Sequence, residues 1–319
     1  MRASVGDASL VCKEIPIVAS AVDYRILSQQ SHGQRMGTRG GGFVDCVLSA
    51  AQPINYMVSV QSIVVPLGFF VNKDVTAKTC SSSAAANKGL QCVTDADCGG
   101  TAGSCASATL DNVSRPMVVN IFSGSAWYWT DFGAGFNSKP ITACLRHAGA
   151  GTHSTLDYAV MNPLWGASLA VNESASEPTM WFNDSSADEM KCINGISGAI
   201  GYADADQLTG TGAATYPNVA AVKYQGYEPK RVNIRNGLYD AWSFHMLYFD
   251  TYYAPYFSNG VYRYIFNKLN DYVNNPNNIS LSSLEASANY WAPRDEMVYM
   301  KGVDWYYPVY CGASKPVAP

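Results

Sequence analysis

The residues best suited to chemistry lie in one glycine-rich stretch, Arg146-His147-Ala148-Gly149-Ala150-Gly151-Thr152. An apolar segment, 141–145, precedes it, and a segment with apolar residues at helical spacing follows it. The first N–H groups of a helix lack partners within the helix, and the helix dipole adds positive charge, so anions bind there readily. Arg146 and Thr152 add a guanidinium and a hydroxyl donor. The stretch predicts an oxyanion-binding turn, and the simpler alternative is an ordinary strand-to-helix turn with a surface arginine.

Groups suited to catalysis are scarce in this chain. It has 4 histidines and contains neither a Gly-x-Ser-x-Gly nucleophile elbow nor a His-Glu-x-x-His zinc motif. His147 and His153 flank the turn and would suit acid–base chemistry on a phosphate, but a structural or ligand-contacting role is commoner for such histidines. The sequence therefore favours a binding protein over an enzyme, and it indicates no metal or cofactor.

Alternating strands and helices are expected to position this turn. The segments with strand character are 15–21, 57–65, 69–71, 141–145, 219–224 and 238–249. The segments with helical spacing are 152–161, 186–193 and 260–274, the last with Val261, Tyr264, Ile265, Leu269 and Tyr272 on one side, whereas 118–122 suits a strand or a short helix. This order predicts an α/β fold with mixed, largely parallel sheets.

Length and charge exclude several classes of protein. The chain has 319 residues, of which 48% are hydrophobic and 14% charged, so it suits two units of ordinary domain size. The net charge of -4, without a cluster of lysines and arginines, offers no field for nucleic acid. The apolar run 56–71 is interrupted by Gln61 and Pro66, so a buried pair of strands explains it better than a membrane span.

The cysteines indicate an oxidising compartment. None of the 9 lies in a haem or zinc motif, so we expect disulfides in an exported protein, periplasmic or extracellular. Four of them lie in a polar segment, 79–108, which we interpret as an insertion held by two disulfides of open connectivity. The candidates are Cys12, Cys46, Cys80, Cys92, Cys98, Cys105, Cys144 and Cys192. The chain opens without the features of a signal peptide, which suggests a removed leader or a late start.

Two motifs resemble those of a known family. Arg-x-x-Gly-x-Gly-Thr after an apolar strand resembles the phosphate-contacting segment of periplasmic phosphate-binding proteins, the type II solute-binding proteins of ABC importers. The segment Gly198-Ala199-Ile200-Gly201-Tyr202-Ala203 is similar to a Gly-Ala-Ile-Gly-Tyr strand of that family. The segments 64–72 and 236–243 also match in order and separation. The resemblance covers most of 50–275 and implies a two-lobed periplasmic binding protein type II fold.

The resemblance implies particular anion contacts. They fall on Arg146, Gly151 and Thr152, whereas the serine expected two residues before Thr152 is Ala150 here. The missing hydroxyl costs about 0.5–1.5 kcal/mol if nothing replaces it. We therefore expect that His153 or a water compensates, or that the ligand differs from phosphate.

The resemblance also implies an acidic residue in the first lobe, which accepts the proton of hydrogen phosphate and repels sulfate. The candidates are Asp7 with Ser9, and Asp23 is the alternative; a solvated aspartate near a chain end is the simpler interpretation. The family's opening anion loop has no counterpart upstream of Val5. We therefore expect lobe one to lack its first strand, helix and strand. Either another polypeptide supplies these elements, or the protein folds with an exposed sheet edge.

The implied architecture assigns 1–75 and 225–319 to lobe one and 76–224 to lobe two. We expect an exported protein that closes its lobes over phosphate or a similar oxyanion and delivers it to the membrane permease of an ABC importer. The alternative is an extracellular structural or surface-assembly protein that reuses the fold. The cysteine-rich insertion, the tyrosine-rich C-terminal part and the missing first elements favour it. Sequons at Asn112, Asn172, Asn183 and Asn278 fit an exported chain.

One disulfide is predicted from position along the chain. Cys144 lies in the strand leading into the turn, and Cys192 lies at the end of the helix before Gly198. We expect these two to pair, which leaves Cys311 free or bound to another chain.

Overall fold

A single long strand, β4 (Met57–Asn72), organises the fold. The sequence predicts two strands here, but β4 continues through Pro66, which lies opposite Trp242 of the neighbouring strand. A proline removes only its own N–H from the ladder, so pairing continues on both sides of it. β12 (Trp242–Asp250) pairs with β4 from Met57 to Pro66, and β10 (Ala199–Asp204) pairs with it from Leu67 to Val71.

The structure, a computed structural model, describes residues 17–20, 35–37, 43–45, 57–81, 87–146, 150–161, 180–183, 185–250, 260–280, 289–302 and 308–310. Several predicted residues lie outside this part of the chain, namely Asp7, Ser9, Cys12, Asp23, Cys46, His147, Gly149, Asn172 and Cys311. The predictions that depend on them remain predictions.

The main sheet is mixed, as predicted. Its nine strands follow the order β1-β12-β4-β10-β8-β9, with β7, β11 and β13 off this path. The remaining bounds are β1 (Ile17–Ser20), β7 (Asn112–Val113), β8 (Thr142–Arg146), β9 (Met180–Asn183), β11 (Val219–Tyr224) and β13 (Ala292–Pro293). Among the described residues, parallel pairing is limited to β10–β8, β8–β9 and β7–β11. The sheet is less parallel than expected because β4 runs antiparallel to β10, β11, β12 and β13.

Helices form at the three predicted positions, 152–161, 186–193 and 260–274. The bounds of the helices are α2 (Arg115–Phe122), α3 (Gly151–Thr155), α4 (Ser186–Gly195), α5 (Gly212–Thr215), α6 (Arg231–Arg235), α7 (Val261–Asn274) and α8 (Pro276–Ser280). The sequence does not predict α5, α6 or α8. A π-helix, η3 (Leu156–Met161), continues α3, and short 3-10 turns are η1 (Asp95–Cys98), η2 (Trp129–Phe132) and η5 (Arg294–Glu296). Segment 118–122 is helical because the hydroxyl of Ser114 caps α2 by accepting from the N–H of Met117. Among the described residues, no helix combines the length and apolarity that crossing a bilayer requires.

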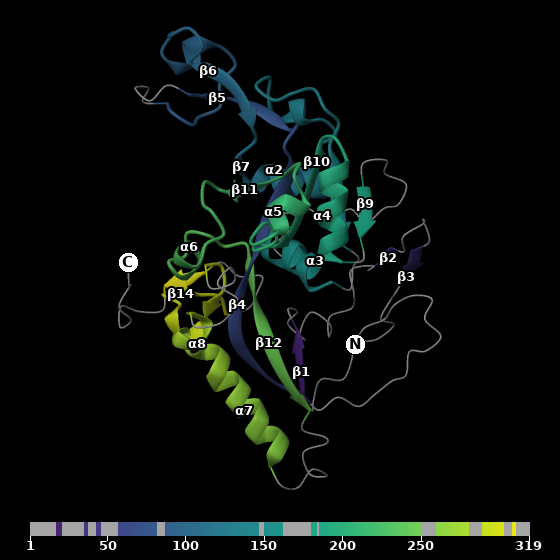
Figure 1. The fold of residues 1–319 in the computed structure, drawn as a ribbon, viewed down its shortest axis with the longest axis vertical. Coiled ribbons are helices and arrows are strands. Elements are labelled where there is room, and N and C mark those ends of the chain that lie inside the picture. The colour runs from purple at the N-terminus through teal and green to yellow at the C-terminus, as the bar shows by residue number, and fades with distance from the viewer. Residues whose placement is uncertain are drawn as a thin grey trace.

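The cysteine-rich insertion forms a small disulfide-linked hairpin. β5 (Thr76–Cys80) pairs antiparallel with β6 (Cys105–Thr109), and Figure 1 shows this hairpin at one end of the molecule. Disulfides join Cys80 to Cys98 and Cys92 to Cys105. The prediction of two disulfides in this segment is therefore confirmed, and they use all four of its cysteines. The two remaining short sheets pair β2 (Arg35–Gly37) with β3 (Phe43–Asp45) and β14 (Tyr299–Met300) with β15 (Val309–Tyr310).

Helix α7 buries a different side from the one predicted. Phe266 packs against Phe249 of β12, with ring centroids 5.7 Å apart, and Figure 1 shows α7 beside β4 and β12. The predicted apolar side is exposed, with Val261, Tyr264, Ile265, Leu269 and Tyr272. Both sides of the helix carry apolar residues, because Tyr262, Phe266 and Val273 form a second stripe. The second stripe is the one that is buried, because it packs against β12.

Candidate functional site

Three parallel strands end at one edge of the sheet, called here the carboxyl edge. Strand β8 ends at Arg146, β9 at Asn183 and β10 at Asp204, and Arg146 lies opposite Asn183 in the register. The helix after β8 begins at Gly151, and the helix after β9 begins at Ser186. Because parallel strands place their carboxyl ends together, the starts of α3 and α4 meet at this edge.

Arg146 connects the two helix starts. Its Nη1 donates to the hydroxyl of Ser186 at 2.8 Å and to the hydroxyl of Thr152 at 3.3 Å. Its backbone N–H donates to the hydroxyl of Tyr202 on β10 at 3.2 Å. The structure therefore brings together the predicted Arg146 and Thr152 and adds Ser186 and Tyr202, which the sequence analysis missed.

His153 supports this arrangement from within the core. The side chain is buried, and its Nδ1 lies 2.6 Å from the hydroxyl of Tyr202. The same hydroxyl accepts the N–H of Arg146, and the tautomer of His153 decides whether Nδ1 or the hydroxyl donates in the bond between them. His153 thus helps to hold the tyrosine that holds Arg146. The expected replacement of the missing serine by His153 remains untested, since this ring nitrogen contacts Tyr202.

The start of α3 lacks a side-chain cap. Ala150 is its N-cap residue and has no hydroxyl to accept a helix N–H, whereas Ser185 accepts the N–H of Asp188 at the start of α4. Ala150 is buried, and Gly151 and Thr152 follow it at intermediate exposure. The hydroxyl that the resemblance predicts at position 150 is therefore absent from the N-cap position of α3.

Two acids lie near Arg146, one buried and one of intermediate exposure. Glu189 of α4 is fully buried, and its Oε1 accepts the N–H of Tyr202 at 3.0 Å. Burial raises the pKa of Glu189 well above its ordinary value, opposed by that hydrogen bond and by Arg146. Burial, and then the neighbouring Asp206, raise the pKa of Asp204 to about 6, and Arg146 again opposes the shift. Burial thus raises the pKa of both acids, and the positive charge of Arg146 opposes both shifts.

Gly201 explains how Glu189 reaches the sheet. A Cβ at this glycine would lie 2.8 Å from Cδ1 of Ile193 and 3.1 Å from Oε1 of Glu189. Only a residue without a side chain leaves room for α4 to pack so closely on β10. The glycine in the Gly-Ala-Ile-Gly-Tyr segment therefore has a packing role next to the site.

A disulfide joins the two segments that carry Arg146 and Ser186. Cys144 of β8 pairs with Cys192 of α4, which confirms the predicted pairing. Both cysteines are buried. A second link joins α3 to β12, because the hydroxyl of Thr155 donates to that of Ser243 at 2.8 Å. Strand, helices and covalent bond thus fix the relative positions of the side chains at the carboxyl edge.

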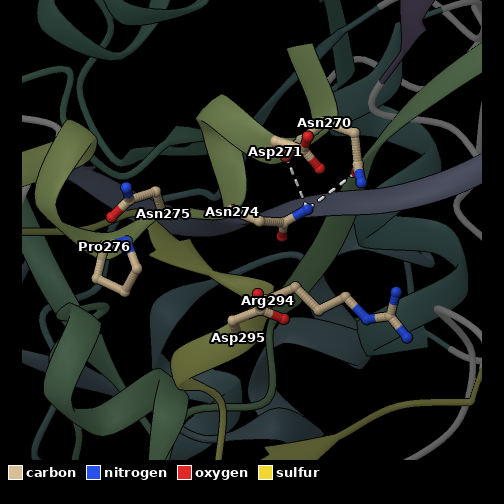
Figure 2. A pocket seen from close by; sticks show the side chains of 7 residues that line it. All are labelled: Asn270, Asp271, Asn274, Asn275, Pro276, Arg294 and Asp295. Atoms are coloured by element: carbon tan, nitrogen blue, oxygen red, sulfur yellow. Dashed lines mark hydrogen bonds between the residues drawn. The ribbon is translucent and has the colours of Figure 1, made fainter. Parts of the chain in front are cut away.

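Two cavities lie elsewhere in the described part of the chain. The larger, about 440 Å³, is polar, and Figure 2 shows the residues that line it, Asn270, Asp271, Asn274, Asn275, Pro276, Arg294 and Asp295. The smaller, about 270 Å³, lies between β4, β11 and Tyr290. Neither is lined by a predicted site residue. The sulfur atoms of Cys80, Cys92 and Cys98 lie close together, as a metal site would require, but they belong to the two disulfides of the insertion.

Comparison with known proteins identifies the fold. No protein-family model matches the chain, and no curated protein matches it. Among solved structures, it resembles a high-affinity periplasmic phosphate-binding protein, PfluDING, bound with phosphate, at 15% identity and a TM-score of 0.50 over 90% of this chain and 77% of that one. A putative phosphate transporter substrate-binding protein from Clostridium perfringens, with bound phosphate, matches at 14% identity and a TM-score of 0.46, over 70% and 68% of the chains.

The Borrelia burgdorferi protein PstS matches at 10% identity and a TM-score of 0.41, over 65% of each chain, which is just under two thirds of its length. At such sequence identities a structural likeness shows the fold alone, and the assignment of the fold rests on the match to PfluDING. The chain has the mixed α/β fold of the phosphate-binding proteins.

Proposed function

We propose that this protein is an exported binding protein that holds phosphate or a similar oxyanion at the carboxyl edge of β8 and β9. The observation that carries the proposal is the guanidinium of Arg146, which the hydroxyls of Thr152 and Ser186 hold at the starts of two helices. Fixed donors of this kind suit an anion of high charge density. The fold shared with phosphate-binding proteins supports the choice of phosphate, and the disulfides support export.

The proposed mechanism is closure over the anion. Lobe one would comprise 1–75 and 225–319, and lobe two 76–224, so that β4 and β12 provide the connection between them. Asp7 and Ser9, or Asp23, would approach the anion from lobe one. Closure would exclude water from the donors, and the closed form would be recognised by a membrane permease of the ABC type.

A second function remains a candidate because of one surface. The exposed apolar stripe of α7 is unusual for a monomeric soluble protein, and it suits an extracellular assembly that reuses the fold. The sequons, which fit an exported chain, cannot all be used. Asn183 is buried and donates to the carbonyl of Leu145, so it is closed to glycosylation in the folded protein.

Calorimetric titration with phosphate, sulfate and acetate tests the proposal. We expect saturable phosphate binding that Arg146→Ala abolishes, because the substitution removes the positive charge and the group that orients two hydroxyls. Arg263→Ala on the exposed side of α7 is the matched control and should leave the affinity unchanged. Wild-type affinity in Arg146→Ala would refute the site. Failure of all three anions to bind or to raise the melting temperature would favour the assembly function.

A further inference from the structure

We infer that Ser186 is an anion-contacting residue that replaces the hydroxyl absent at Ala150. The inference rests on the proposed function and assigns a donor that the resemblance does not predict. Ser186 is 40 residues from Arg146 in the chain, yet its hydroxyl oxygen lies 2.8 Å from Nη1 of the arginine. Thr152, a predicted anion contact, binds the same nitrogen. The two hydroxyls therefore lie on the same side of the guanidinium.

The direction of these hydrogen bonds leaves both hydroxyls able to donate. In each bond the arginine is the donor and the hydroxyl oxygen is the acceptor. A hydroxyl has one proton to donate in addition to its acceptor sites. An oxyanion is a matching acceptor, and a hydrogen bond to a charged partner is stronger than one between neutral groups. Ser186 and Thr152 would thus bind the anion while Arg146 holds their oxygens.

The backbone at Ser186 adds to the same effect. Ser186 is the first residue of α4, a helix of ten residues, so its N–H and that of Ala187 have no partner within the helix. The helix dipole makes this end positive. Asp188 lies in the same turn and opposes an anion, but its carboxylate accepts the hydroxyl proton of Ser185 and pairs with Lys191 at 3.2 Å. Its charge is therefore partly offset.

The covalent frame keeps Ser186 in place. Cys144 precedes Arg146 by two residues in β8, and its disulfide partner Cys192 lies in α4 with Ser186. The positions of the arginine and the serine are thus coupled by a bond as well as by packing. A fixed donor replaces the lost one without the entropy cost of ordering a mobile side chain.

Titration of the intact protein with inorganic phosphate at constant pH tests this assignment. Ser186→Ala should weaken phosphate binding about 10- to 100-fold, the range for a hydrogen bond to a charged group. Ala150→Ser in the Ser186→Ala background should restore most of the affinity, because it returns a hydroxyl to the start of α3. Ser197→Ala is the matched control, since its hydroxyl accepts from Lys139 away from the site, and it should bind as the wild type does.

A second pair of variants guards against misfolding. Ser186→Thr and Ser186→Val have nearly the same shape and differ in the hydroxyl, so only the threonine variant should bind phosphate like the wild type. Wild-type affinity in Ser186→Ala, with binding abolished in Arg146→Ala, would overturn the assignment and leave the proposed function standing. Weakened binding that Ala150→Ser does not restore would mean that Ser186 only orients Arg146, and would also overturn it. Absence of phosphate binding in the wild type would refute both.

Discussion

The protonation of Asp204 links the stability of this protein to its anion site. Asp204 ends β10 and is largely buried, and its pKa of about 6 compares with an ordinary value of 3.8. As pH rises from 4 to 7, the unfolded chain releases the proton before the folded protein does, so stability falls through this window. The difference corresponds to a cost of up to about 3 kcal/mol above pH 6.

The substitution Asp204→Asn should remove this cost. We expect the free energy of unfolding at pH 7.5 to exceed that of the wild type by up to about 3 kcal/mol, and the gain to disappear near pH 3.5, where the aspartate is neutral in both states. Urea denaturation at a series of pH values measures it. Asp111→Asn is the matched control, because it changes the net charge equally at an exposed position.

The same substitution should change anion binding. Phosphate affinity is measured for the wild type and for Asp204→Asn at the same pH, because a change in the ionisation of the ligand affects both proteins equally. The variant should bind phosphate more tightly than the wild type at pH 7.5, and the difference should be smaller at pH 5, because protonation of Asp204 removes a negative charge near Arg146. A stability gain that is the same at pH 3.5 and pH 7.5, or a less stable variant at pH 7.5, would refute the role assigned to Asp204.

Two further predictions concern the frame of the site. Replacing Cys144 and Cys192 with alanine removes a disulfide between cysteines 48 residues apart in the sequence. The free energy of unfolding in urea should fall by about 4 kcal/mol, because the unfolded chain is no longer cross-linked. An unchanged denaturation midpoint would contradict this. Glu189→Gln keeps the acceptor for the N–H of Tyr202 and should preserve stability, whereas Glu189→Ala should cost about 1–3 kcal/mol in the same assay. Equal stability of these two variants would show that the hydrogen bond contributes nothing.

The local part of the site could be predicted from the sequence. Arg146 and Thr152 are six residues apart, so the order of strand, glycines and helix places them at one helix start. Ser186 and Tyr202 reach Arg146 only because β9 and β10 both lie beside β8. Strand order in a sheet is set by non-local pairing, which the periodicity of a single sequence does not encode. Glu189 was missed for the same reason, since its burial depends on the contact with Gly201.

Two other departures from the predicted fold have simpler causes. A proline was taken as the end of a strand, but Pro66 loses one ladder hydrogen bond within a strand of sixteen residues that has partners on both sides of that point. The buried face of α7 was assigned to one side of the helix, although apolar residues lie on two sides of it. Periodicity measures amphipathicity, and only the packing partner, here Phe249, decides which side is buried.

Several local features that lower stability meet at the carboxyl edge. The N-cap residue of α3 has no capping hydroxyl, the helix passes into a π-helical turn, and Asp204 carries the cost of a raised pKa. Such departures from favourable local structure concentrate at functional sites, where the fold around them offsets their cost. An ordinary strand-to-helix turn needs none of them. Their coincidence around Arg146 therefore favours an anion site over a structural turn, and it predicts that variants which repair stability here will change binding as well.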